Sequence, residues 1–412
     1  MNTFSYVIIS ALVIKFLLDI IADGLNLRAL RHRVPTKLEG VYRPEEYQKS
    51  QDYLRSRTRF GFAISSFSLV VLLIFWFSGG FNFLAQLVRS WELGAILSGL
   101  IFISIILIAY QFLMLPFSIY ATFVIEEHFG FNRSTPRLFV MDRLKGLVLT
   151  LLLGGTLLSG ILALFTYAGN YAWLYCWLAV TLFQFFLQFI APVWIMPLFN
   201  KFTPLEPGQL RDAIESYARS AGNRISNIFV IDSSKRSTKS NAFFTGFGRT
   251  KRIALFDTLI EKHSVPELVA ILAHEIGHHK KGHVLQGMVI SILHTGLIFY
   301  LLSVLLNNPG LYQAFYMQAP SLYAGLVFFG LLYTPVEMLL SIALNAFSRR
   351  NEYEADRFAT ETTEEPEDFK GALKNLAADN LANLTPHPFY VFLNYSHPTL
   401  LGRLSAIKKQ AG

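Results

Sequence analysis

The sequence predicts an α-helical polytopic membrane protein: seven transmembrane helices with a soluble metal-binding domain on the cytosolic side. Hydrophobic residues make up 53% of the 412 positions, more than an ordinary soluble enzyme contains. Seven apolar segments are long enough to cross a bilayer. The connections between these segments alternate between basic and nearly uncharged, and one basic connection holds a His-Glu-x-x-His run at residues 274–278.

The seven apolar segments each approach or exceed the roughly 20 residues that a membrane-spanning helix needs. They lie at residues 4–22, 60–88, 94–124, 146–168, 172–199, 284–306 and 322–348. The second and third are longer than a bilayer requires, so we expect them to tilt or to extend beyond it. Pro335 lies inside the last segment and predicts a kink there.

Lysine and arginine residues predict the orientation of these helices. Four connections hold 34 of the 36 basic residues, namely 26–59, 126–145, 201–283 and 349–412. The positive-inside rule therefore places these four segments in the cytosol, the N-terminus outside and the C-terminus inside. The net charge of +8 thus reflects topology, and we expect no nucleic-acid partner.

These observations divide the chain into four regions. Residues 1–200 form transmembrane helices 1–5, and 201–283 form the cytosolic metal-binding domain. Residues 284–348 form helices 6 and 7, and 349–412 form a C-terminal cytosolic segment. Because the chain has a single cysteine, Cys176, we expect neither an intrachain disulfide nor a thiolate metal cluster.

The cytosolic domain begins with a mixed α/β pattern. Residues 208–222 predict an amphipathic helix, and the apolar run within 227–234 predicts a strand. Two further apolar runs within 241–260 are separated by Gly246 and Gly248, which allow the chain to turn. We therefore expect a β-hairpin at this place.

A helix that begins at about Val265 follows the hairpin. Ser264 and Glu267 have the S-x-x-E spacing of a capping box, in which each side chain bonds to the backbone of the other. On this helix His274 and His278 are four residues apart and share a face, so both imidazoles can bind one metal ion.

The run from His274 to His278 has the composition of a hydrolytic metal site. Glu275, next to the first histidine, can take a proton from a water molecule that the metal activates. A catalytic zinc site needs three protein ligands, so a third must come from elsewhere in the cytosolic part of the chain. The two histidines with a carboxylate suit zinc best among the divalent metals.

The third ligand is expected in the acidic, helical stretch 348–359, where the chain returns to the cytosol. Glu352 and Asp356 are four residues apart and share a face, whereas Glu354 points elsewhere. We assign Glu352 as the ligand and Asp356 as the acceptor that orients a ligand histidine. Spacing alone leaves Glu352 and its carboxylate neighbours as competing candidates.

Four segments together resemble the type I CAAX prenyl protease family. They are "SNAFFTGFGRTKRIALFDTL", "AHEIGHHKKGH", "SRRNEYEADRFA" and "YSHPTLLGRL". The resemblance implies a gluzincin-like zinc metallopeptidase domain, with one Zn²⁺ per chain, at the cytosolic end of a water-filled intramembrane chamber. It also implies that Glu352 is the third ligand and that substrates are peptides, including prenylated C-terminal tails.

Three further residues are candidates for contacts with substrate. His397 is expected to act as a second catalytic electrophile, as the resemblance suggests. Arg403 could hold a substrate carbonyl or a C-terminal carboxylate. Asn241 and the strand after it could pair with an extended substrate. His283, after the His-Glu-x-x-His run, is expected to mark the membrane boundary.

Two other functions remain open from the sequence. A protease that clears misfolded membrane proteins would have the same zinc site, and a zinc-binding carrier without hydrolysis would leave Glu275 without a role. Asp257 and His274 lie 17 positions apart, whereas some eukaryotic members of the family carry a long insertion there. We therefore expect a bacterial homologue in the inner membrane, with the endoplasmic reticulum as the alternative. The expected partners are a peptide substrate and the lipid bilayer.

Overall fold

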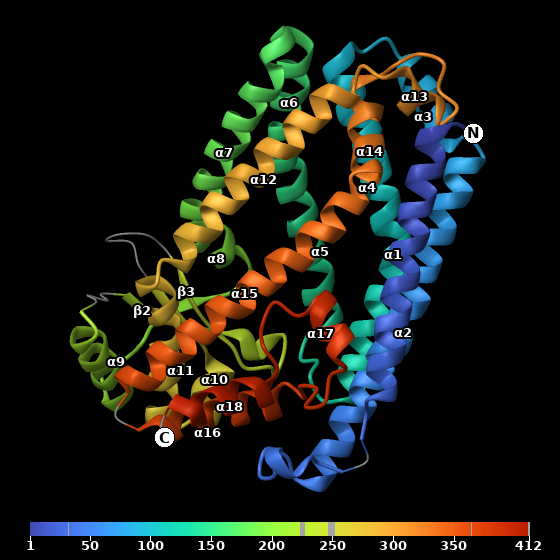
Figure 1. The fold of residues 1–412 in the computed structure, drawn as a ribbon. Helices are drawn as coiled ribbons and strands as arrows, with labels where there is room; N and C mark the ends of the chain where they lie inside the picture. The colour runs from blue at the N-terminus through green and yellow to red at the C-terminus, as the bar shows by residue number, and fades with distance from the viewer. Residues whose placement is uncertain (32, 223–226, 246–251, 364, 411–412) are drawn as a thin grey trace.

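The computed structural model describes residues 1–31, 33–222, 227–245, 252–363 and 365–410. Long helices rise from a mixed α/β part that contains the C-terminus (Figure 1). The helices of the tall part are α1 (Thr3–Arg28), α2 (Pro44–Phe77), α3 (Gly80–Arg89), α4 (Ala95–Tyr120), α5 (Pro136–Leu149), α6 (Gly155–Tyr167), α7 (Ala172–Ile190), α8 (Met196–Phe199), α12 (His283–Leu305), α13 (Pro309–Gln313), α14 (Leu322–Leu332) and α15 (Thr334–Thr362). Those of the mixed part are α9 (Gln209–Ser220), α10 (Asp257–Lys262), α11 (Val265–Lys280), α16 (Pro366–Asp379), α17 (Pro388–Asn394) and α18 (Leu400–Gln410).

Among the described residues, six helices are long and apolar enough to cross a membrane, and a bent pair makes a seventh. Three of the six include short π-helical turns that join neighbouring elements. The six are Thr3–Arg28, Pro44–Phe77, Ala95–Glu126, Pro136–Tyr167, Gly169–Phe199 and His283–Leu305. The predicted count of seven spans therefore holds when the bent pair is taken as one span.

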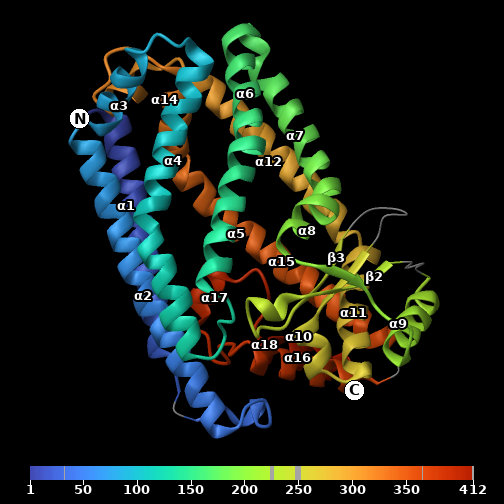
Figure 2. The ribbon, with the colours of Figure 1, turned by 180° about the vertical axis from the view of Figure 1, so that it is seen from behind.

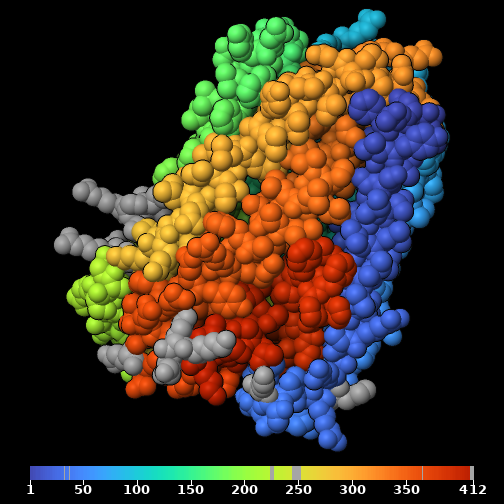
Figure 3. Space-filling view, viewed as in Figure 1, coloured from blue at the N-terminus to red at the C-terminus, as the bar shows by residue number. Residues whose placement is uncertain are grey.

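The bent pair consists of α14 and α15, which meet at an angle of 51°. The break lies at Tyr333–Thr334, and Pro335 stands in the first turn of α15, where its missing N–H leaves no hydrogen bond unmade. The predicted kink is therefore confirmed. Because of this bend, α15 crosses the face of the molecule obliquely and reaches the mixed part, as Figure 3 also shows.

The predicted continuous helix over 60–88 is wrong. The helix α2 ends at Phe77, Gly79 adopts φ +77°, and α3 begins at Gly80. The reason is a change of pattern: α3 buries Phe81, Leu84, Ala85 and Val88 along one face, as an amphipathic helix does. An apolar window does not register this change, so the sequence made one span from two helices.

The basic connections are also more helical than the sequence suggested. In the segment 26–59, α1 runs to Arg28 and α2 already begins at Pro44. In 126–145, α5 begins at Pro136. Arginine and lysine are good helix formers, so the spanning helices continue beyond their apolar windows.

The mixed part contains a four-stranded sheet with the order β1-β2-β4-β3, seen from behind in Figure 2. The strands are β1 (Phe202–Pro204), β2 (Asn227–Ile231), β3 (Ala242–Thr245) and β4 (Arg252–Phe256). β2 and β4 are parallel, and the other two pairs are antiparallel. The strand expected within 227–234 and the antiparallel pair expected within 241–260 are confirmed. The proposed turn at Gly246 and Gly248 lies outside the described residues, and the short strand β1 was not predicted.

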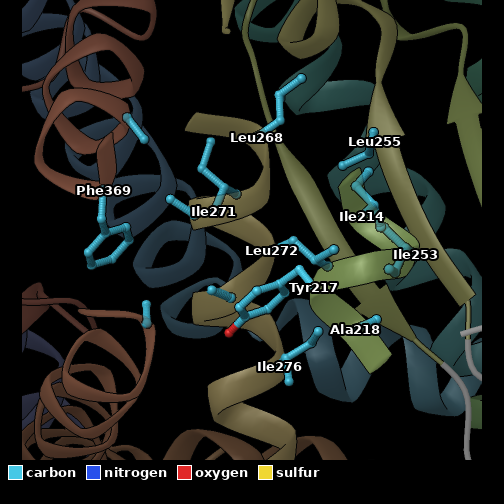
Figure 4. Packing of buried hydrophobic residues seen from close by; sticks show 14 of the residues in the cluster. Ile214, Tyr217, Ala218, Ile253, Leu255, Leu268, Ile271, Leu272, Ile276 and Phe369 are labelled. Atoms are coloured by element: carbon cyan, nitrogen blue, oxygen red, sulfur yellow. The ribbon is translucent and has the colours of Figure 1, made fainter. Parts of the chain in front are cut away.

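The helix α11 forms the centre of the mixed part. Its side chains pack against the sheet and α9 on one side and against α15 and α16 on the other, as Figure 4 shows for Leu272 and Ile271. Ile253 of β4 and Phe369 of α16 belong to the same buried cluster. A helix buried on several sides has little freedom to move, so it offers a rigid support for functional side chains.

Candidate metal centre

The helix α11 begins where the sequence predicts. The Ser264 hydroxyl accepts a hydrogen bond from the Glu267 amide, and the Glu267 carboxylate accepts one from the Ser264 amide. This capping box fixes the first turn, so the positions of the histidines on the helix are set from its start. His274 is buried and His278 is half-buried.

Three potential metal ligands converge at the contact between α11 and α15. The Nε2 atoms of His274 and His278 are 3.2 Å apart. Glu352 places one carboxylate oxygen 3.2 Å from His278 Nε2 and the other 3.5 Å from His274 Nε2. Two ligands of a tetrahedral zinc ion, each about 2.0–2.1 Å from it, lie about 3.3 Å apart. The spacing of the three residues therefore fits zinc.

The surroundings of Glu352 also fit a cation. Its side chain is only 6% exposed, and its Oε2 has no hydrogen-bond donor among the described residues. A buried, ionised carboxylate oxygen without a donor is costly unless a positive charge lies beside it. Burial opposes a charge on His274, yet hydrogen bonds to Asp356 and Glu352 raise the pKa of its imidazole to about 9. The site thus attracts positive charge.

Gly277 lets the two ligand-bearing helices approach each other. A Cβ atom at this position would lie 3.1 Å from the backbone oxygen of Ala355 and 3.2 Å from Cβ of Phe358, both on α15. These distances are closer than ordinary van der Waals contacts, so a larger residue would push α11 and α15 apart. The glycine in the His-Glu-x-x-His run therefore brings Glu352 within reach of the histidines.

Asp356 lies one helical turn beyond Glu352 and contacts His274 on the opposite side of the imidazole ring. His274 Nδ1 is 2.9 Å from Asp356 Oδ1. Arg403 of α18 holds the same carboxylate from the other side, with Nε donating to Oδ2 at 2.8 Å. The ring of His274 also stacks on Phe369, with centroids 5.9 Å apart. Phe369 has no motif around it, and sequence reasoning did not select it.

Glu275 is placed where two pockets meet. It lines a small pocket of about 150 Å³ together with His274, Glu352 and Arg403. It also lines a larger pocket of about 570 Å³, which extends to His294 on α12. Burial raises the pKa of the Glu275 carboxyl, which makes its carboxylate a better proton acceptor than a solvated glutamate.

The three candidates for substrate contact all line the small pocket. His397 is exposed, and its Nε2 lies 3.3 Å from Glu352 Oε1. Asn241 stands just before β3, where its side chain accepts a hydrogen bond from the amide of Ala242. Arg403 is engaged by Asp356, so any contact that it makes with substrate has to share its guanidinium with that carboxylate. The structure brings these residues to one place without testing their roles.

Both halves of the chain match known protein families. Residues 25–201 match the N-terminal part of the CAAX prenyl proteases, described as five membrane helices, and residues 204–411 match peptidase family M48. The crystal structure of Ste24p from S. mikatae superposes with a TM-score of 0.92 at 33% identity, covering 99% of each chain. The chain belongs to the CAAX prenyl protease family of M48 peptidases.

Curated members of this family are similar over nearly their whole length. The CAAX prenyl protease 1 homologue of Oryza sativa is 35% identical, over 96% of this chain and 95% of its own. CAAX prenyl protease 1 of Saccharomyces cerevisiae is 35% identical, over 91% and 88% respectively. The Homo sapiens homologue is 33% identical, also over 91% and 88%.

Membership of the family confirms two expectations from the sequence. The chain is a multi-pass membrane protein with the predicted helical fold, and it is a membrane metallopeptidase of family M48. The carrier interpretation is thereby set aside. The relatives named above are all eukaryotic, so the predicted bacterial origin receives no support from them.

Proposed function

We propose that this peptidase holds one Zn²⁺ on His274, His278 and Glu352 and cleaves CAAX-type C-terminal tails that carry a prenyl group. The observation that carries the proposal is the convergence of these three side chains, with ligand atoms within 4.8 Å of one another, in a chain related to CAAX prenyl proteases. A zinc ion there supplies Lewis acidity, which acidifies water and polarises a carbonyl group.

The protein's own residues have distinct parts in the proposed reaction. The carboxylate of Glu275 takes the proton of the attacking water and later delivers it to the leaving amide nitrogen. His397, beside the ligand set, donates a hydrogen bond to the carbonyl oxygen as negative charge develops on it. Asp356 accepts the Nδ1 proton of His274, which directs Nε2 of the ring toward the zinc position.

An extended peptide can be held by the edge of the sheet. β3 is the last strand in the order β1-β2-β4-β3, and it follows directly after Asn241, which lines the small pocket. A substrate that pairs with this edge would be fixed by backbone hydrogen bonds. We propose that Arg403, in the same pocket, interacts with a carbonyl or the C-terminal carboxylate of the bound tail.

The larger pocket supports a substrate with an apolar group. Besides Glu275 and His278, it is lined by Val284, Ile290 and Phe347, and its volume of about 570 Å³ lies in the range of ligand pockets. A prenyl chain near the cleavage site could be accommodated there. We further propose that the site faces the cytosol, where prenylated tails occur, with the N-terminus outside; relatives of eukaryotic origin favour the endoplasmic reticulum over the bacterial inner membrane.

The substrate class is tested with two peptides of identical CAAX sequence, one farnesylated and one not. Cleavage is measured with detergent-purified protein over a range of peptide concentrations. We expect a higher kcat/KM for the farnesylated peptide, because its lipid adds apolar contacts in the larger pocket. Equal values for both peptides would contradict the prenyl preference and favour a protease that clears membrane proteins more generally.

A further inference from the structure

The second ligand histidine has an orienting system of its own. His278 directs Nε2 toward His274 and Glu352, which leaves its Nδ1 on the far side of the ring. That Nδ1 lies 3.0 Å from Nδ1 of His283. When the ring of His278 binds a metal through Nε2, its Nδ1 carries a proton, so His278 donates and His283 accepts.

His283 is itself held in the required tautomer. Its side chain is 4% exposed, and its Nε2 lies 3.3 Å from Glu354 Oε2. The proton on His283 thus resides on Nε2 and is donated to the carboxylate of Glu354. Arg350 donates from Nε to the other oxygen of Glu354 at 3.0 Å. The row of contacts runs from the half-buried His278 to an arginine at the surface.

The two ligand histidines are therefore supported in parallel ways. His274 is backed by the carboxylate of Asp356, which Arg403 holds. His278 is backed by a carboxylate and an arginine too, Glu354 and Arg350, with one imidazole inserted between. Glu352, Glu354 and Asp356 alternate along α15, so this helix supplies the third ligand together with both supporting carboxylates.

Local backbone geometry explains how His283 reaches His278. A continuous helix would place residue 283 on the face of residue 279. Instead α11 ends at Lys280, Gly282 adopts φ +72°, and α12 begins at His283. This left-handed residue, which glycine adopts without strain, redirects the chain so that the His283 ring packs on His278 with centroids 5.1 Å apart.

We infer that His283 and Glu354 are positioning residues of the metal centre, which fix the tautomer and the ring orientation of His278. This inference rests on the proposed zinc site. It replaces the expectation that His283 only marks the membrane boundary. Loss of such supporting contacts typically weakens metal binding 10–100-fold.

The inference is tested by zinc affinity, measured on the full-length protein in detergent by competition with a fluorescent chelator. We expect His283→Leu to weaken zinc binding about 10–100-fold, because the His278 Nδ1 proton then has no acceptor. His283→Asn should recover most of the affinity, since the Asn Oδ1 stands at the same bond distance along the side chain as Nδ1. Glu354→Gln should fall between the wild type and His283→Leu, and Glu361→Gln, an exposed glutamate on the same helix, should match the wild type.

Thermal unfolding of the zinc-free proteins separates positioning from a merely structural role. We expect the zinc-free melting temperatures of the wild type, His283→Asn and Glu354→Gln to agree. Unchanged zinc affinity in His283→Leu and Glu354→Gln, or equal weakening in His283→Leu and His283→Asn, would overturn the inference. A wild type that binds no zinc would instead overturn the proposed function on which the inference rests.

Discussion

At the scale of single residues, the metal centre depends on which face of a helix each carboxylate occupies. The spacing of Glu352 and Asp356 predicted that they share a face, and both contact His274. Glu354 was expected to point elsewhere, and it does, toward His283. Spacing could not choose among these carboxylates, because that choice depends on how α15 is rotated against α11, which is a property of the folded molecule.

Substitution of Asp356 tests the support of the first ligand. Asp356→Asn keeps the size of the side chain but removes the negative charge beside His274 and Arg403. We expect zinc affinity to fall about 10–100-fold, because the neutral amide is a weaker acceptor for the Nδ1 proton. Chelator competition measures the change, and the double variant Asp356→Asn/Arg403→Gln should lose less than the sum of the two single losses. Additive losses would contradict a shared interaction.

At the scale of secondary-structure elements, the close approach of α11 and α15 creates the site. The sequence predicted the start of α11 and its histidine face from local rules that do not depend on the rest of the fold. It also predicted β2 and the pairing of β3 with β4. It did not predict the turn at Gly282 or the break at Gly79, because each depends on packing between segments that are distant in the sequence.

The approach of the two helices is tested by Gly277→Ala. The added Cβ would lie 3.1 Å from the backbone oxygen of Ala355, so we expect a loss of about 1–3 kcal/mol in stability together with weaker zinc binding. Gly61→Ala is the matched control, because Gly61 lies in α2 and a Cβ atom added there would have nothing within 4 Å. Thermal unfolding measures both variants. Equal melting temperatures for the two would show that the contact is not tight.

At the scale of the whole molecule, the seven-span architecture follows largely from composition. The apolar windows identified the spanning regions, and the basic connections proposed their orientation. Two features were beyond such windows: the amphipathic character of α3, and the continuation of α2 and α15 beyond their apolar parts. The extension of α15 matters most, because it carries Glu352 from the spanning region to the histidines of α11.

The central claim is that the His-His-Glu centre binds zinc and that Glu275 is the proton acceptor in peptide hydrolysis. The most direct measurement compares purified wild type with Glu275→Gln for zinc content and for cleavage of a farnesylated CAAX peptide. We predict about one zinc per chain in both proteins, and cleavage by the wild type alone, because glutamine cannot take the proton of the attacking water. Equal cleavage by the two proteins, or a wild type that cleaves the peptide without zinc, would contradict the account.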